Sequence, residues 1–188
     1  MRKLSVFNHV TLDGYFTGEN GDMSWAHKGN DDAEYQAFVA GNASGDAELL
    51  FGRVTYDMMA SYWPTPVASE HAPIVAEKMN SGKKVVFSKK MDKALWNNTR
   101  LVKGDLIEEV RKLKEEKGPD MVILGSGSIV AQLAAAGLID NYQIVINQVA
   151  LGKGRTLFEG LPQMVSLKLV SSRTFNNGKV FLSYEAVV

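Results

Sequence analysis

A buried strand that runs directly into a glycine-rich turn and a helix, at Met121–Val130, dominates the pattern of this sequence. The apolar run Met121-Val122-Ile123-Leu124 is followed by Gly125-Ser126-Gly127-Ser128, after which apolar residues recur at helical spacing. A helix start offers unpaired backbone N–H groups, and glycine lets the backbone approach an anion closely. The stretch therefore predicts either a phosphate-binding turn or a plain strand–helix turn.

Strand and helix patterns alternate along the rest of the chain. Further strands are predicted at 4–10, 47–51, 83–88, 100–102 and 142–149, and helices at 31–42, 56–63, 72–81 and 105–117. Asn30 or Asp31 is expected to cap the first helix, and Pro64 and Pro66 to stop the second. Alternating strands around Asn176-Asn177-Gly178 predict a hairpin. The expected fold is α/β, with a mostly parallel central sheet, helices on both faces and a C-terminal antiparallel hairpin.

Length and composition limit the classes of function. The 188 residues predict a single domain over 1–188, and 21 Lys plus Arg balance 21 Asp plus Glu, so no overall charge favours nucleic acid or a membrane surface. There is no Cys, and His9, His27 and His71 lack metal-ligand spacing, so no metal site is expected. We find no signal peptide and no apolar run that could span a bilayer, which predicts a cytoplasmic protein.

Three predicted strands end in small or cationic residues. These strand exits are Gly52-Arg53, Ser88-Lys89-Lys90 and Gly125-Ser126-Gly127-Ser128. Ligands bind such sheets at the carboxyl ends of the strands. If the three strands are neighbours, backbone donors and cations converge on one edge, which suits a phosphorylated ligand of dinucleotide size.

Two common nucleotide-binding motifs do not fit the sequence. A Rossmann fingerprint requires Gly-x-Gly-x-x-Gly/Ala after the first strand, whereas here the turn comes late and Val130 takes the third small position. A Walker loop would end in Gly-Lys-Ser/Thr, which does not follow this turn.

An ordered set of motifs covers nearly the whole chain. The motifs are Thr11-Leu12-Asp13-Gly14, Trp25, Gly52-Arg53-Val54-Thr55-Tyr56, Ser88-Lys89-Lys90, Gly125-Ser126-Gly127-Ser128 and Leu151-Gly152-Lys153-Gly154-Arg155-Thr156-Leu157-Phe158. Together they resemble the dihydrofolate reductase-like family, and most closely the branch that contains the reductase domain of bacterial riboflavin biosynthesis.

The resemblance implies binding of NADPH. Gly52, Arg53 and Thr55 would meet phosphate oxygens at the start of the second helix. Ser88, Lys89 and Lys90 would hold the adenosine end and its 2′-phosphate, although a two-lysine run is also common in solvated turns. The pyrophosphate would lie on a turn that comprises Gly125, Ser126, Gly127, Ser128 and Ile129. In this family the Gly125–Ser126 pair can form a cis peptide.

The substrate side is less clear in the sequence. Phe16 and Trp25, on the long polar loop at 13–25, are expected either to wall a pocket or to anchor the loop. Dihydrofolate reductases place a carboxylate where Asn30 stands here, and Asp31 is the predicted catalytic residue because helical spacing to Tyr35 puts it on the inward face. The other predicted substrate-binding residues are Asn8, Glu34 and Tyr56, and Lys153 and Arg155 could meet a substrate phosphate.

These features predict a reductase that transfers a hydride from NADPH to a small pterin- or pyrimidine-like heterocycle. One alternative is a stand-alone riboflavin-pathway reductase of 5-amino-6-(5-phosphoribosylamino)uracil, without the zinc deaminase domain, whose cysteines cannot exist here. Another is an NADPH-binding module without turnover. A homodimer is expected from the edge strands and the apolar last strand at 180–188.

Overall fold

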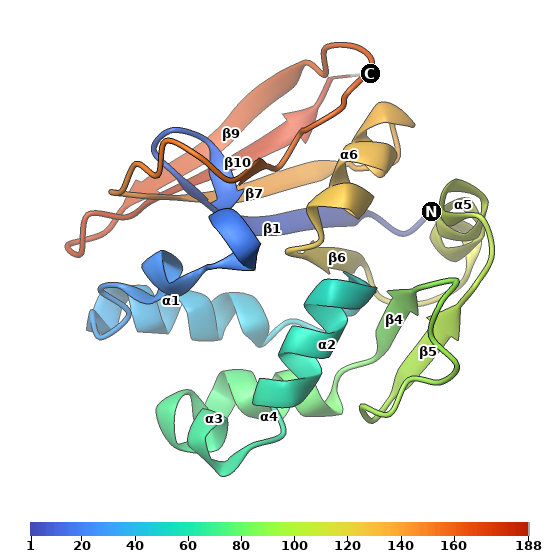
Figure 1. Cartoon of the computed structure of the whole chain (residues 1–188), viewed down its shortest axis with the longest axis horizontal. Coiled ribbons are helices and arrows are strands. Elements are labelled where there is room, and N and C mark those ends of the chain that lie inside the picture. Colours follow the sequence, from blue (N-terminus) through green and yellow to red (C-terminus); the bar gives the residue numbers. More distant parts are fainter. Residues whose placement is uncertain (188) are drawn as a thin grey trace.

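The computed structural model describes residues 1–187 and shows a twisted sheet with helices on both faces (Figure 1). Eight strands form the sheet in the order β5-β4-β3-β6-β1-β7-β10-β9. Neighbouring strands from β5 to β7 run parallel, and β10 and β9 add antiparallel pairs at one edge. The bounds are β1 Leu4–Thr11, β3 Glu48–Gly52, β4 Lys84–Phe87, β5 Thr99–Val102, β6 Met121–Leu124, β7 Asn141–Asn147, β9 Leu167–Thr174 and β10 Val180–Ala186.

Six α-helices are assigned within the described residues, with the bounds α1 Ala33–Ala43, α2 Arg53–Tyr62, α3 Pro66–His71, α4 Pro73–Ser81, α5 Leu106–Glu115 and α6 Gly127–Ala135. The apolar residues of α5 and α6 pack on one face of the sheet, with Leu4, Val6 and Ile123 fully buried beneath them. These three residues alternate with side chains that point to the opposite face, as the pleat of a strand requires.

The opposite face carries two separate apolar clusters. Near β3 and β4, Phe51 and Val86 pack with Tyr56, Met79 and Trp96. Near β7 and β10, Val145 and Phe181 pack with Tyr35 and Phe175, while Phe38 and Val39 of α1 cover them. A second, two-stranded sheet, formed by β2 Tyr15–Thr17 and β8 Arg155–Thr156, is separate from the main sheet. The two clusters are separate, and neither covers the middle of this face, which lies between α1 and α2.

The predicted fold class and the order of the elements are confirmed, with local differences. Asp32, not Asn30 or Asp31, caps α1, because its carboxylate accepts the N–H of Tyr35 at 2.8 Å. Pro66 does not stop a helix but begins the short α3, where a missing N–H has no cost at the first position. No helix within residues 1–187 is long and apolar enough to cross a membrane.

The C-terminal hairpin is tied to the chain before α1. Lys179, only 2% exposed, donates from its ammonium to the carbonyl of Ala26 at 2.9 Å and to Oδ1 of Asn30 at 2.5 Å. The side-chain amide of Asn177 donates to the carbonyl of Gly29 at 2.8 Å. These bonds hold the turn that leads into α1 in place.

Candidate functional site

The three glycine- and lysine-bearing strand exits lie side by side. β4, β3 and β6 are consecutive in the sheet, and all three are parallel, so their carboxyl ends face the same edge. We call the residues at this edge the glycine edge: Gly52–Thr55, Ser88–Lys89 and Gly125–Ile129, all of which line one cleft. The sequence prediction required the three strands to be neighbours in the sheet, and they are.

Hydrogen bonds join the starts of α2 and α6. The backbone N–H of Gly52 donates to Oγ of Ser126 at 2.9 Å, and the N–H of Ser126 donates to Oγ1 of Thr55 at 3.0 Å. The Nδ2 of Asn8 on β1 donates to the carbonyl of Gly125 at 3.1 Å. Three strands and two helix starts are thus held in fixed relation before any ligand arrives.

The turn between β6 and α6 has an unusual backbone. Gly125 has φ of 57°, and Ser126, a non-glycine residue, has φ of 56°. The left-handed region is costly for serine, and the bonds of its N–H and hydroxyl to the α2 start hold it there. The cis peptide that the Gly125–Ser126 pair can form in this family is not present here, because no described peptide bond is cis. The two positive φ angles turn the chain instead.

Phe16 lies against the start of α6. A Cβ added to Gly127 would stand 2.5 Å from the Phe16 ring, and the ring is 5% exposed. Only glycine therefore fits at this position while the Phe16 ring keeps its place. Phe16 was expected on the substrate side, but the structure places it beside the glycine edge, where it forms part of the cleft wall.

The cations differ in how they are held. Arg53 lines the cleft and pairs with Asp57 at 2.9 Å, with about half of each side chain exposed. Lys89 is exposed and lines the cleft, whereas Lys90 lies outside it. Oγ of Ser88 accepts the backbone N–H groups of Lys90 and Met91 at 3.2 and 3.1 Å, so it shapes the turn.

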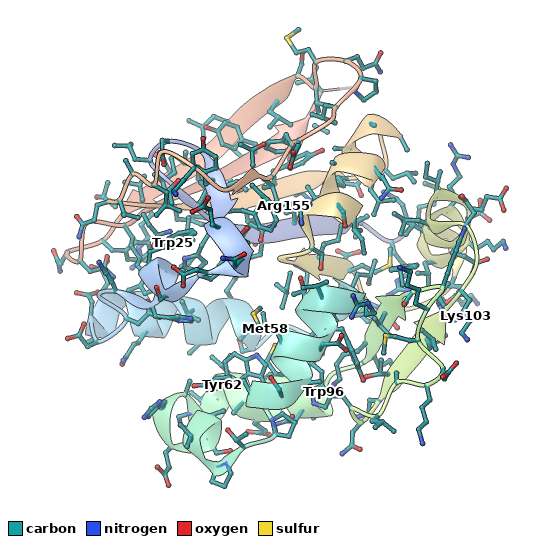
Figure 2. The ribbon with its side chains drawn as sticks, in the orientation of Figure 1. Trp25, Met58, Tyr62, Trp96, Lys103 and Arg155 are labelled. Atoms are coloured by element: carbon teal, nitrogen blue, oxygen red, sulfur yellow. The ribbon has the colours of Figure 1, made fainter. Side chains whose placement is uncertain are left out.

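The whole cleft has a volume of about 2280 Å³, and it continues from the glycine edge across the sheet between α1 and α2. We call this part the groove. Its floor comprises Phe7, His9, Leu49, Val122 and Leu124, and Val39 and Ala43 of α1 form one wall. Val54, Met58 and Tyr62 form an exposed apolar stripe along α2, four residues apart, with Met58 on the side that faces α1 (Figure 2). Sequence inspection missed this stripe, although its spacing is visible.

Two predicted substrate residues are acidic, and neither has the expected position. Asp31 lines the cleft but is exposed in a turn before α1, so its assignment to the inward face of the helix is wrong. Glu34 lies outside the cleft, where its carboxylate pairs with Arg173 at 2.8 Å. The helix begins at Ala33, so Asp31 precedes it and the helical spacing from Asp31 to Tyr35 does not apply.

Of two aromatic residues in the motifs, Tyr56 differs from its prediction, and Trp25 takes the second of its two expected roles. Tyr56 is buried, and its hydroxyl accepts the backbone N–H of Trp96 at 2.9 Å, so it belongs to the packing beneath α2. Trp25 is 4% exposed and donates from Nε1 to the carbonyl of Asp22 at 3.2 Å, which makes it a loop anchor (Figure 2). Both lie outside the cleft lining.

The glycine loop at 151–158 is divided between the site and the surface. Lys153 pairs with Glu19 at 2.6 Å, with both side chains largely exposed. Arg155 lines the cleft and also a smaller hollow of about 330 Å³ beside Gly127 and Ser128. Arg155 is the cation of this loop that is placed next to the glycine edge.

A polar group on the groove floor was not found from the sequence. His9 of β1 contacts the Tyr35 hydroxyl through Nε2 at 3.1 Å and Nδ2 of Asn147 through Nδ1 at 3.3 Å. Burial lowers the pKa of His9 from 6.5 to about 4, and the nearby Lys179 charge lowers it further, while the Asn147 bond opposes the shift. The imidazole is therefore neutral at pH 7.

Among residues 1–187, no group of three or more His, Asp or Glu side chains could hold a metal ion.

Comparisons with known proteins agree with this architecture. The model of the RibD C-terminal domain family matches residues 2–181. The uncharacterized protein YyaP of Bacillus subtilis (strain 168) is 31% identical over 183 residues, which cover 97% of this chain and 94% of that protein. The chain belongs to the RibD C-terminal domain family.

Solved structures define the fold. A putative riboflavin biosynthesis protein from Shewanella sp. PV-4 superposes with a TM-score of 0.75 at 24% identity, over 100% of both chains. Dihydrofolate reductase from Enterococcus faecalis, complexed with NADP(H) and RAB-propyl, superposes with a TM-score of 0.66 at 16% identity, over 99% of this chain and 97% of that one. The fold is that of the dihydrofolate reductase-like proteins.

Proposed function

We propose that this chain is an NADPH-dependent reductase that transfers a hydride to a small, pterin- or pyrimidine-like substrate. One observation supports the proposal above the others: three strand exits with phosphate-binding chemistry lie on consecutive parallel strands. The family match and the NADP(H)-bound structural neighbour point to the same reaction class.

In this proposal the cofactor lies along the glycine edge. The N–H groups at the start of α6 and the Arg53 guanidinium bind phosphate oxygens, and Ser88 and Lys89 hold the adenosine end. The nicotinamide then extends toward the Asn8 side of β1, where the cleft opens into the groove. The cofactor supplies the hydride, and the chain orients the two reactants and excludes water.

Titration with NADPH tests the proposal, and quenching of tryptophan fluorescence reports the binding. The chain has three tryptophans, of which Trp63 lines the cleft. Arg53→Ala is expected to weaken NADPH binding about tenfold and to weaken NADH binding less. Arg173→Ala is the matched control, because it removes an exposed arginine paired with Glu34 outside the cleft. No binding of NADPH at micromolar concentration would refute the proposal, and equal losses for both nucleotides would remove the 2′-phosphate assignment.

The two alternatives separate in the same assays. A binding module without turnover would show NADPH binding but no substrate-dependent oxidation. A riboflavin-pathway reductase would oxidise NADPH with the phosphoribosylamino-uracil substrate, and Arg155, beside Ser128, is the cation that supports this alternative. Loss of that activity in Arg155→Ala, with Lys153→Ala as the control, would favour it.

A homodimer and a cytoplasmic location remain part of the proposal. Within residues 1–187 the outer strand β9 pairs on one side only, and it exposes Leu169 and Val170, which are 51% and 54% accessible. Sedimentation velocity measures the mass directly, and a monomer at micromolar concentration would contradict the dimer.

A further inference from the structure

The polar group on the groove floor has a fixed orientation. Nδ2 of Asn147 donates to the carbonyls of Val10 and Val145, both at 3.1 Å, and lies 3.3 Å from Nδ1 of His9. Exchanging the amide oxygen and nitrogen of Asn147 would place an oxygen against two carbonyl oxygens. The amide nitrogen therefore faces Nδ1 of His9. A proton on Nδ1 would point at this nitrogen, which accepts no hydrogen bond, so Nδ1 carries no proton.

This orientation determines which atom carries the proton of His9. The neutral imidazole has one N–H, and because Nδ1 carries no proton, that N–H is at Nε2. Nε2 then donates to the Tyr35 hydroxyl at 3.1 Å. The hydroxyl oxygen accepts this bond, and its own hydrogen has no acceptor among residues 1–187. Burial raises the pKa of the Tyr35 phenol, so the hydroxyl keeps its proton at neutral pH.

We propose that the free O–H of Tyr35 is the hydrogen-bond donor that recognises the substrate in the groove, and that the substrate therefore presents a carbonyl oxygen or an imine nitrogen to it. Tyr35 and His9 both line the cleft, on α1 and β1 respectively. His9 is a positioning residue, because it acts through the tyrosine. This inference rests on the proposed reductase function and specifies the substrate class.

None of the nearby carboxylates Asp31, Asp32 and Glu34 takes the substrate-recognition role that we assign to Tyr35. Asp32 caps α1, Glu34 pairs with Arg173, and Asp31 is exposed in the preceding turn. Asn30, where a carboxylate was expected, accepts from the ammonium of Lys179. A carboxylate would select a substrate with N–H donors, whereas a hydroxyl donor selects one with an acceptor.

The reaction balances without a further reactant. A bound NADPH would supply one proton and two electrons, as a hydride, to the carbon of the C=O or C=N bond. The π-electron pair moves to the oxygen or nitrogen, which the Tyr35 hydroxyl polarises and which takes a proton supplied by solvent. The products are NADP⁺ and the alcohol or amine. Stabilising the developing charge on the heteroatom lowers the barrier.

The tautomer is testable on the protein without any ligand. Long-range ¹H–¹⁵N spectra distinguish a protonated Nε2 from a protonated Nδ1 in a neutral histidine. We expect His9 to carry its proton on Nε2 at pH 7, with His9→Gln identifying its signals. A proton on Nδ1 would mean that Tyr35 gives its hydrogen to His9, and the proposal would be overturned.

The donor role is tested with 9,10-phenanthrenequinone, whose carbonyl oxygens can only accept hydrogen bonds. The wild type is expected to oxidise NADPH with this probe, and Tyr35→Phe to lower kcat/KM about tenfold while NADPH binding stays unchanged. Tyr184→Phe, which removes a tyrosine hydroxyl on β10 outside the cleft lining, is the control and should retain activity. If the wild type binds NADPH but does not reduce the quinone, or if Tyr35→Phe has wild-type kcat/KM, the Tyr35 proposal fails alone. If NADPH does not bind, the proposed function fails first.

Discussion

At the glycine edge, backbone N–H groups and small hydroxyls come from single turns of the chain, whereas the groove beside α1 joins residues from opposite ends of the sequence. Gly125 and Ser126 are adjacent, but His9 and Asn147 are 138 residues apart. The first region is stiff because helix starts and strand ends bond to one another. The second is built from apolar packing around a few buried polar groups. Short motifs can therefore reveal a binding edge, while the groove depends on the tertiary fold.

The largest expected effect lies in the glycine edge. Gly127→Ala places a Cβ 2.5 Å from the Phe16 ring and should lower the free energy of unfolding by about 2 kcal/mol. Phe16→Ala in the same chain should remove the clash, so the two losses will not add. Gly41→Ala on α1, where a Cβ meets nothing within 4 Å, is the control. Chemical denaturation of the wild type, the two single variants, the double variant and Gly41→Ala measures these losses, and additive losses would mean that the ring does not rest on Gly127.

A second prediction concerns the groove floor and pH. The pKa of His9 is lowered from 6.5 to about 4 in the folded state, so the unfolded chain binds more protons between these values. The contribution of His9 to stability is complete above pH 6.5 and is lost as pH falls toward 4. We expect a loss of about 1–2 kcal/mol from this group. Urea unfolding at pH 7 and pH 4.5 should show a smaller pH dependence in His9→Gln; an identical dependence in both proteins would contradict the prediction.

The bond between the two helix starts gives a smaller effect. Thr55→Val keeps the side-chain shape but removes the acceptor of the Ser126 N–H, which should cost about 1 kcal/mol of stability and weaken NADPH binding. Thr55→Ser retains the hydroxyl and serves as the control. Calorimetric titration with NADPH, run beside thermal unfolding, measures both quantities. If Thr55→Val binds NADPH with wild-type affinity, the bond between Ser126 and Thr55 does not contribute to cofactor binding.

The smallest effect on stability is expected in the groove wall. Met58 is 44% exposed, so Met58→Gln should change the free energy of unfolding by less than about 0.5 kcal/mol. The polar side chain should nevertheless raise the KM for phenanthrenequinone, because it removes apolar surface from the groove, and leave NADPH binding intact. Val67→Gln, an exposed residue on α3 outside the cleft, is the control. An unchanged KM would exclude the α2 stripe from the substrate site.

The sequence was sufficient for the fold and for the edge of the sheet that carries the glycine turns, because both depend on local patterns and on the rule that parallel strands end together. It was not sufficient for Asp31, since a turn at 28–31 leaves this residue before the helix, where helical spacing to Tyr35 does not apply. Nor could it place Trp25 and Tyr56, whose motif positions suggested ligand contact but whose rings fill the interior. The Tyr35–His9 contact crosses 26 residues between a helix and a strand, and no periodicity reports it.

The bonds of Lys179 to Ala26 and Asn30 have a consequence for the order of folding during synthesis. Phe175 and Phe181, which pack against Tyr35 and Phe38, also belong to the final part of the chain. The strands and helices around the glycine edge are all translated by residue 135, so they can associate while the ribosome is still adding the hairpin. The wall formed by α1 has to wait for residues 175–181. A nascent chain that is released early would carry a nearly complete glycine edge and no enclosed groove.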